Sequence, residues 1–361
     1  MLLNHNKQPE TKENNSLYLI LLSLIAKRLL NSATALAASL SYAILSLSPT
    51  VFGFAAHATH FVILFTLAGT LLLLSCLEKD KLLLFGVSGL LFGLAFLMKQ
   101  PAIFFVLFGG YAILHAGLMP RPAGRKALAA RLMIFSLGAA APLILVLAAA
   151  WLSSGFDKFW FWTFKYATDY AGFRPLFDII MTFQINFFKV VRGFEILWII
   201  GLFGLLCLFI DKRYKQIRWF ILSFSFLSFF AVCPGFHFRH HYFILLLPAV
   251  SLLIGIPFNS ILYYLSQKNN NKMFRYFPFA LFLLAIGLGI NTHKNYFFIE
   301  NTEALCRSIY EGNPFVESLK IAEFIKSKTG PEDKIAVLGS EPQIFFIPKG
   351  EPPPDTYTLM D

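Results

Sequence analysis

Two short groups of residues could do chemistry in this sequence. Lys99 stands in LMKQP, between two long apolar runs, where a fixed cation could hold a phosphate. The other interpretation is that this lysine only extends its ammonium group toward lipid headgroups. The second group is HFRHHY, residues 237–242, which holds three histidines and one arginine. No carboxylate or fourth ligand stands beside these histidines, so we expect neither a metal nor another cofactor.

The segment that must position Lys99 is the apolar run 82–119. This run is interrupted once, at Lys99-Gln100-Pro101. Because a helix needs about 20 apolar residues to cross a membrane, the run is long enough to cross, turn and cross back. Pro101 suits the first turn of the returning helix, and Gly89 with Gly93 would let a neighbouring helix approach closely. The pattern therefore predicts a membrane hairpin with Lys99 at its mouth.

The composition indicates an all-α polytopic membrane protein. Hydrophobic residues make up 57% of the 361 residues, charged residues make up 14%, and the mean hydropathy is +0.64. A soluble chain carries about 25% charged residues, so a soluble globular protein is excluded. The net charge of +11 does not indicate a nucleic-acid partner, because the basic residues lie in short loops rather than on one face. The predicted partner is instead the lipid bilayer.

The sequence predicts about nine transmembrane helices within residues 17–292. Their segments lie near 30–48, 57–77, 82–98, 101–119, 132–153, 196–210, 219–236, 243–265 and 278–292. Residues 1–16 are polar, and we expect a tail there without a cleavable signal peptide. The apolar stretch 17–26 is too short to span by itself. It is a half-helix, an interfacial segment or the remnant of a longer element.

Basic residues mark alternate loops and so predict the orientation of the chain. Three of these loops lie near 121–131, 211–218 and 268–275, and together they carry eleven Lys and Arg and one acid, Asp211. Because Lys and Arg in short loops stay cytoplasmic, Lys99, the loop 154–195, the HFRHHY loop and the tail are predicted on the outer face. We therefore expect a multi-pass protein of a bacterial plasma membrane, with 293–361 as an extracytoplasmic segment.

The outer loop 154–195 is dense in aromatic residues. Its first part reads SSGFDKFWFWTFKYATDYAGFRP. This composition suits a belt of Trp and Tyr at headgroup level, or a surface helix with aromatic faces for a sugar or a lipid chain. Residues 176–191 have apolar side chains at near-helical spacing, with Asp178, Gln184 and Lys189 between them. They predict an amphipathic helix that lies in the membrane interface.

The C-terminal segment 293–361 is the only part that is typical of a soluble structure. Residues 315–328 predict an amphipathic helix. KIAVLG, at 334–339, and QIFFI, at 343–347, predict two strands, so that we expect a small α/β piece. One helix and two strands are too little for an independent core. The piece is therefore expected to lean on the membrane domain or to be incomplete.

Five stretches together carry a family pattern. They are AKRLLNSATALAASLSYAILSLSPTVFG, GLLFGLAFLMKQP, FDKFWFWTFKYATDY, RHHYFILLLPAVSLL and AEFIKSKTGPEDKIAVLGSEPQIFF. In this order they resemble the GT-C superfamily of polytopic glycosyltransferases, in particular the protein O-mannosyltransferases of glycosyltransferase family 39 and the lipid A aminoarabinose transferase. The resemblance implies transfer of a sugar from a polyprenyl-phosphate-linked donor to an acceptor glycan, lipid or protein on the outer membrane face.

The resemblance also implies roles for the two groups of residues named first. Lys99 matches the lysine that follows the Gly-rich helix, and Arg239 with His240, His241 and Tyr242 matches a basic and aromatic cluster that opens a late helix. These residues would bind the lipid phosphate. Fixed cations would stabilise the negative charge that the phosphate gains as the sugar departs. The other interpretation of the histidines is ordinary polarity at the membrane interface.

The chain departs from the family pattern in its acidic residues. The family carries an Asp that activates the acceptor in its first outer loop, but this chain has no acidic residue between 14 and 77 or between 81 and 156. His57 and His60 stand where a second acidic position is often found. His60 could act as a base, although a histidine at a helix end is usually only a polar cap. Asp169, in YATDYAG, is preferred as a contact to the sugar or acceptor. The catalytic residue is unassigned, with Asp169 and His60 as candidates.

Three functions are compatible with these features. The first is an inverting membrane glycosyltransferase. The second is a non-catalytic or truncated GT-C-like protein, which the missing carboxylates favour. The third is a transporter or flippase for a lipid-linked sugar, which is disfavoured because charged residues within the spans are almost absent. An enzyme would release the free lipid phosphate, whereas a flippase would leave the donor intact.

Overall fold

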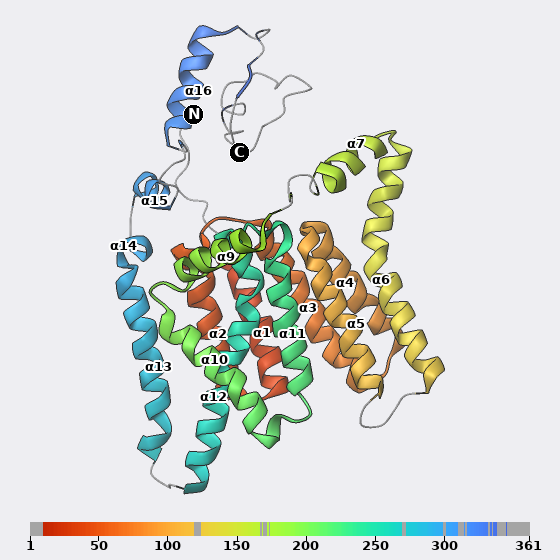
Figure 1. The fold of residues 1–361 in the computed structure, drawn as a ribbon, viewed down its shortest axis with the longest axis vertical. Coiled ribbons are helices and arrows are strands. Elements are labelled where there is room, and N and C mark those ends of the chain that lie inside the picture. Colours follow the sequence, from red (N-terminus) through yellow and green to blue (C-terminus); the bar gives the residue numbers. More distant parts are fainter. Residues whose placement is uncertain are drawn as a thin grey trace. The chain divides into compact units, whose positions relative to one another are not determined.

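The computed structural model describes residues 10–118, 124–166, 168, 172, 174–268, 272–298, 301–309, 314, 316–330, 333, 335–337 and 344. The chain divides into two compact units, residues 1–292 and 293–361. Figure 1 shows the first unit as a bundle of helices. Within the described residues, neither unit contains a strand.

The first unit is built from long helices joined by short turns. They are α1 (Glu10–Leu29), α2 (Ser32–Ser46), α3 (Ala58–Lys79), α4 (Leu82–Met98), α5 (Ile103–Leu118), α6 (Arg125–Leu152), α7 (Phe156–Trp160), α9 (Leu176–Val191), α10 (Glu195–Ile210), α11 (Arg218–Val232), α12 (Leu247–Lys268) and α13 (Lys272–Thr292). A π-helical turn, η3 (Phe161–Lys165), follows α7. Short 3-10 helices lie between them: η1 (Pro49–Val51), η2 (Gln100–Ala102), η4 (Lys212–Tyr214), η5 (Pro234–Phe236) and η6 (His240–Leu245).

Each of the nine predicted apolar segments corresponds to a helix, but nine membrane crossings are not confirmed. Four described helices are long and apolar enough to cross a membrane: Ala58–Lys79, Gln100–Leu118, Arg125–Leu152 and Leu247–Leu265. The helices α9 and α10 would count as a fifth span together, but they are bent by 111° at their junction. Shorter apolar helices are Ser32–Ser46, Leu82–Met98, Arg218–Val232 and Phe277–Thr292. The described helices therefore support an all-α membrane protein with four or five spans by length and composition.

The start of the chain differs from the expected polar tail. Helix α1 begins at Glu10, within the segment 1–16, and continues to Leu29 without a break. Its inner face is fully buried at Leu22, Ile25 and Ala26. The short apolar stretch 17–26 is thus the buried part of a longer helix that packs on α2 and α3.

The predicted hairpin around Lys99 is present. The chain leaves α4 at Met98 because a proline ring at position 101 would clash with the carbonyl of residue 97 in a continued helix. Pro101 then lies in the first turn of η2, which leads directly into α5. The glycines of α4 also have the predicted role: a Cβ on Gly89 or Gly93 would collide with backbone atoms of α6. Figure 1 shows α4 alongside α3 and α6.

Ion pairs secure the ends of these helices that lie away from Lys99. Arg28 of α1 makes a two-point contact with Glu78 of α3, and its Nη1 also donates to Ser75 Oγ at 2.7 Å. Arg131 of α6 pairs with Asp80 at 2.7 Å. Both acidic residues of the charged loop 78–81, which was predicted to be cytoplasmic, are therefore paired with arginines of neighbouring helices. Its orientation relative to the membrane stays a prediction.

The second unit contains three short helices in its described part, α14 (Lys294–Phe297), α15 (Thr302–Ile309) and α16 (Glu317–Lys328). Helix α16 confirms the amphipathic helix predicted for 315–328. Arg307 joins α15 to α16, because it contacts Glu303 at 3.3 Å and Glu317 at 2.6 Å. The two predicted strands lie mostly outside the described residues. Residues 335–337 have no regular structure and residue 344 is helical, so an α/β fold is not confirmed.

Candidate functional site

Three helix boundaries bring the predicted site residues together at one end of the first unit. His57 is the N-cap of α3, Lys99 lies between α4 and η2, and Arg239 is the N-cap of η6. All three have extended backbone, with ψ angles of 146°, 132° and 144°. A side chain at such a break is not tied into a helix surface and can turn toward its neighbours. We call the group Lys99, Arg239, His241, Tyr242 and His57 the Lys99 cluster.

Lys99 is partly buried, and its ammonium group lies 3.9 Å from the centroid of the Tyr242 ring. This distance is typical of a cation–π contact. Burial, and then the positive charge of Arg239, lowers the pKa of Lys99 to about 8. Within the described chain, Lys99 forms no ion pair with a carboxylate. Lys99 thus stays charged at neutral pH beside a second cation, which is an arrangement that favours an anionic ligand.

Two histidines stack beside this lysine. The rings of His57 and His241 lie 4.3 Å apart with an interplanar angle of 9°. Burial lowers the pKa of both, and nearby positive charges lower the pKa of His241 further, to about 3. Both imidazoles are therefore neutral near pH 7. His57 Nε2 is buried and has no hydrogen-bond partner among the described residues, so it can accept or donate one bond to a ligand.

His240 faces a different neighbour from His241. Its ring lies 5.2 Å from that of Phe52, and Phe52 also lies 6.3 Å from His57. Burial and the charge of Lys189, on α9, lower the pKa of His240. Phe52 has a φ angle of 56°, which is a left-handed conformation that is unfavourable for a residue with a side chain. Sequence reasoning missed Phe52, and only the turn signal SPTVFG could have pointed to it.

The loop 154–195 contacts the same end of the bundle. Gln100 Nε2 donates to the carbonyl oxygen of Thr163 in η3 at 3.1 Å. His237 Nδ1 lies 2.9 Å from Arg174 Nη2, just before α9. Helix α9 confirms the helix predicted for 176–191, and it packs on η1, η5 and η6. The aromatic loop is therefore next to Lys99. The sequence alone could not establish this proximity.

The two catalytic candidates from the sequence have different outcomes. Asp169 lies outside the described residues. His60 is on the first turn of α3, where its backbone N–H donates to the carbonyl oxygen of His57 at 3.0 Å. Its ring is 6.4 Å from the ring of Tyr18. The described residues contain no group of three His, Cys, Asp or Glu that could hold a metal ion.

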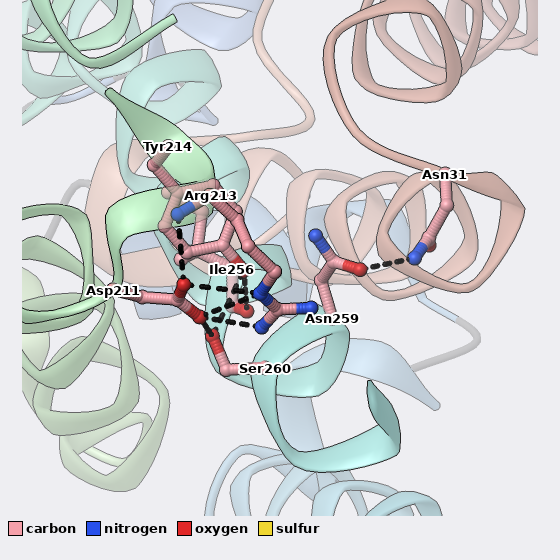
Figure 2. A network of polar contacts seen from close by, with 7 residues as sticks. All are labelled: Asn31, Asp211, Arg213, Tyr214, Ile256, Asn259 and Ser260. Carbon is pink, nitrogen blue, oxygen red and sulfur yellow. Dashed lines mark hydrogen bonds and ion pairs between the residues drawn. The ribbon is translucent and has the colours of Figure 1, made fainter. Parts of the chain in front are cut away.

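The opposite end of the bundle has a polar network of another kind (Figure 2). Asp211 is only 6% exposed, and it accepts hydrogen bonds from the Arg213 backbone and guanidinium and from Ser260 Oγ. Ser260 also bonds Tyr214 Oη at 2.8 Å. The Arg213 side chain holds the pKa of Asp211 below its usual range. We call these residues the Asp211 network.

Comparison with known families gives a match for part of the chain. Residues 15–151 match the model of the family described as dolichyl-phosphate-mannose-protein mannosyltransferase. This region is thus similar to membrane glycosyltransferases of the GT-C type, and the match covers less than half of the chain. Neither the comparison with curated proteins nor that with solved structures gave a match.

The matched region includes Lys99, His57 and His60, whereas Arg239 to Tyr242 lie beyond it. The GT-C resemblance inferred from the sequence is thereby confirmed over α1 to α6. Together with the apolar helices, the match supports an integral membrane protein of the glycosyltransferase class. The family implies a lipid-linked sugar donor and an acceptor in a membrane.

Proposed function

We propose that this protein transfers a sugar from a polyprenyl-phosphate-linked donor to an acceptor on the outer face of the membrane. The observation that carries the proposal is Lys99. Its charge is partly buried beside that of Arg239, it is held against Tyr242, and no described carboxylate pairs with it. Keeping two cations together costs free energy unless an anion joins them. A phosphodiester at headgroup depth is the anion that the family match suggests.

The reaction exchanges one bond at the anomeric carbon of the sugar. The acceptor oxygen forms a bond to this carbon as the bond from the carbon to the phosphate oxygen breaks. The electron pair of that bond passes to the phosphate, which leaves as polyprenyl phosphate. Lys99 and Arg239 would stabilise the added charge, and they act more strongly in a site shielded from water.

The acceptor hydroxyl must also lose its proton. His57 is our candidate for this role, because its imidazole is neutral and its buried Nε2 has no described partner. His60 lies one helical turn further along α3, away from Lys99. We keep Asp169 only as a proposed contact to the sugar or the acceptor, as the sequence suggests, and not as the group that takes the proton.

The test uses the full chain in lipid nanodiscs with radiolabelled polyprenyl-phosphate mannose or aminoarabinose. Incubation with membranes that supply acceptors should release free polyprenyl phosphate and move the label out of the donor. Lys99→Gln should stop both, whereas Lys79→Gln, an exposed lysine at the other end of the bundle, should stop neither. Movement of intact donor between leaflets, without release of lipid phosphate, would instead identify a flippase.

One observation favours a non-catalytic alternative. None of the five residues of the Lys99 cluster carries a carboxylate. A protein that only binds the donor would show Lys99-dependent binding without any release of polyprenyl phosphate. The same assay separates this outcome from catalysis. Activity that is unchanged in Lys99→Gln would contradict the proposed site itself.

A further inference from the structure

A second polar cluster lies next to the Lys99 cluster, and of its members only His60 has a candidate role from the sequence. It contains Tyr18 of α1, Tyr42 of α2 and His60 of α3. The ring of Tyr18 lies 6.4 Å from the ring of Tyr42 and 6.4 Å from that of His60. Tyr18 is 3% exposed and Tyr42 is 2% exposed. Three helices therefore bring polar rings together in the interior of the bundle.

Two polar atoms of this cluster have no partner among the described residues. Tyr42 Oη and His60 Nε2 are both buried, and neither has a hydrogen-bond partner among the described residues. Leaving such a group buried and unpaired costs about 1–3 kcal/mol. Two serines of α2 do not share this property, because Ser39 donates to the carbonyl of Leu19 and Ser41 to that of Ala37. Thr34 of α2 and Thr59 of α3 also have buried hydroxyl groups without a described partner, so the ring cluster is distinguished by bringing a phenol and an imidazole together.

The cluster is continuous with the phosphate site through α3. His57 belongs to the Lys99 cluster and His60 to the ring cluster, and the two are joined by the hydrogen bond from the His60 backbone. One cluster carries fixed positive charge and the other carries phenols and an imidazole. Phenols and imidazoles suit neutral hydroxyl groups, because each can both donate and accept a hydrogen bond.

We propose that Tyr18, Tyr42 and His60 bind hydroxyl groups of the sugar that the donor carries. This inference rests on the proposed function, since a sugar phosphodiester joins one anionic group to one neutral polyhydroxyl group. The phosphate would lie at Lys99 and Arg239, and the sugar would satisfy Tyr42 Oη and His60 Nε2. His60 is then a specificity-determining residue, and the proton of the acceptor passes to another group.

The experiment compares two lipids of equal charge, dolichyl-phosphate mannose and dolichyl methyl phosphate, in which methyl replaces the sugar. An aminoarabinosyl phosphodiester provides a second sugar. Binding is measured on the full chain in nanodiscs. We expect the wild type to bind a sugar diester about 10-fold more tightly than the methyl diester, which corresponds to one or two hydrogen bonds. Tyr42→Phe and His60→Phe should reduce this preference to about 2-fold or less without changing affinity for the methyl diester.

Two controls keep the result interpretable. Tyr111→Phe removes a phenol from α5, outside the cluster, and should leave both affinities unchanged. Tyr18→Phe provides a second variant of the cluster if Tyr42→Phe lowers the yield of folded protein, and thermal unfolding of each variant reports on folding. An equal loss of affinity for both lipids, together with a lower Tm, would indicate a purely structural cluster and overturn the inference.

The outcomes also separate this inference from the proposed function. Retention of the full sugar preference in Tyr42→Phe and His60→Phe, or the absence of any preference in the wild type, would overturn the sugar site alone. Lys99→Gln should weaken binding of both diesters by the same factor. If the wild type bound neither diester, or if Lys99→Gln had no effect, the proposed function would fail and the sugar site with it.

Discussion

The two ends of the helix bundle use charge in opposite ways. In the Asp211 network and the ion pairs near it, each of three carboxylates, Glu78, Asp80 and Asp211, has an arginine partner. In the Lys99 cluster, Lys99 and Arg239 lie close enough for one charge to lower the pKa of the other. The first arrangement neutralises charge within the protein. The second places two positive charges close together.

From this difference we expect the Asp211 end to contribute mainly to stability and the Lys99 end mainly to ligand binding. Paired charges fix the relative positions of helices, because removal of either partner leaves a charge or polar group without compensation. Like charges at a partly buried site reduce stability, so their presence favours a role in binding. The comparison predicts that substitutions at the Asp211 end change unfolding, whereas substitutions at the Lys99 end change ligand affinity. Four measurements test this contrast.

The largest effect on stability is expected for Asp211→Ala. The substitution leaves Arg213 and Ser260 without the acceptor that they share, and we expect it to lower the free energy of unfolding by about 2–3 kcal/mol. Denaturant or thermal unfolding in detergent measures the loss. Affinity for the phosphodiester should stay unchanged in the fraction that remains folded. A large fall in that affinity would show that the two ends do not act independently.

The corresponding substitution at the other end is Lys99→Gln. It removes the charge while keeping a similar length, and it should weaken binding of a polyprenyl phosphodiester about 10- to 100-fold. The Tm should stay the same or rise, since repulsion with Arg239 is relieved. Lys79→Gln is the matched control. The division of roles between the two ends would be wrong if Lys99→Gln lowered the Tm as much as Asp211→Ala.

A pH titration should sharpen the assignment to Lys99. The pKa of about 8 means that its charge is present below this value and lost above it, so affinity for the phosphodiester should fall about 10-fold at pH 9. The pKa values of His57, His240 and His241 lie below their usual value, so these histidines stay neutral throughout this range. The phosphodiester keeps one charge throughout.

Lys99→Arg supplies the control for this titration, because guanidinium does not deprotonate below pH 12. Its affinity should be independent of pH between 7 and 9, even if the different geometry lowers the affinity itself. A persistent fall between pH 7 and 9 in Lys99→Arg would assign the titration to a group other than Lys99.

The smallest effect is expected for Asp80→Asn. Asp80 is 59% exposed in its pair with Arg131, and water screens such pairs. We expect a loss of less than about 1 kcal/mol in the free energy of unfolding, and a smaller loss still in high salt. Unfolding at two ionic strengths measures it. A loss as large as that of Asp211→Ala would mean that burial does not explain the strength of the Asp211 pair.

Much of the fold could be predicted from local sequence because its causes are local. Apolar runs of helical length mark the helices, Pro101 ends α4, and the spacing of apolar residues in 176–191 gives α9. The same reasoning fails for membrane crossing, because several apolar helices are shorter than a bilayer and α9 meets α10 at 111°. Composition indicates burial away from water, but it does not distinguish lipid from the protein interior.

The site could be predicted only in part. The sequence by itself determined that Lys99 would stand at a break between two helices, because apolar length and a proline fix that position. Only the tertiary structure decided that His57 stacks on His241, that Tyr242 covers Lys99, and that Tyr18 and Tyr42 approach His60. Helical periodicity tells which side of a helix is buried but not which helix will face it. Contacts between distant segments depend on how all the helices pack together, and no local pattern encodes them.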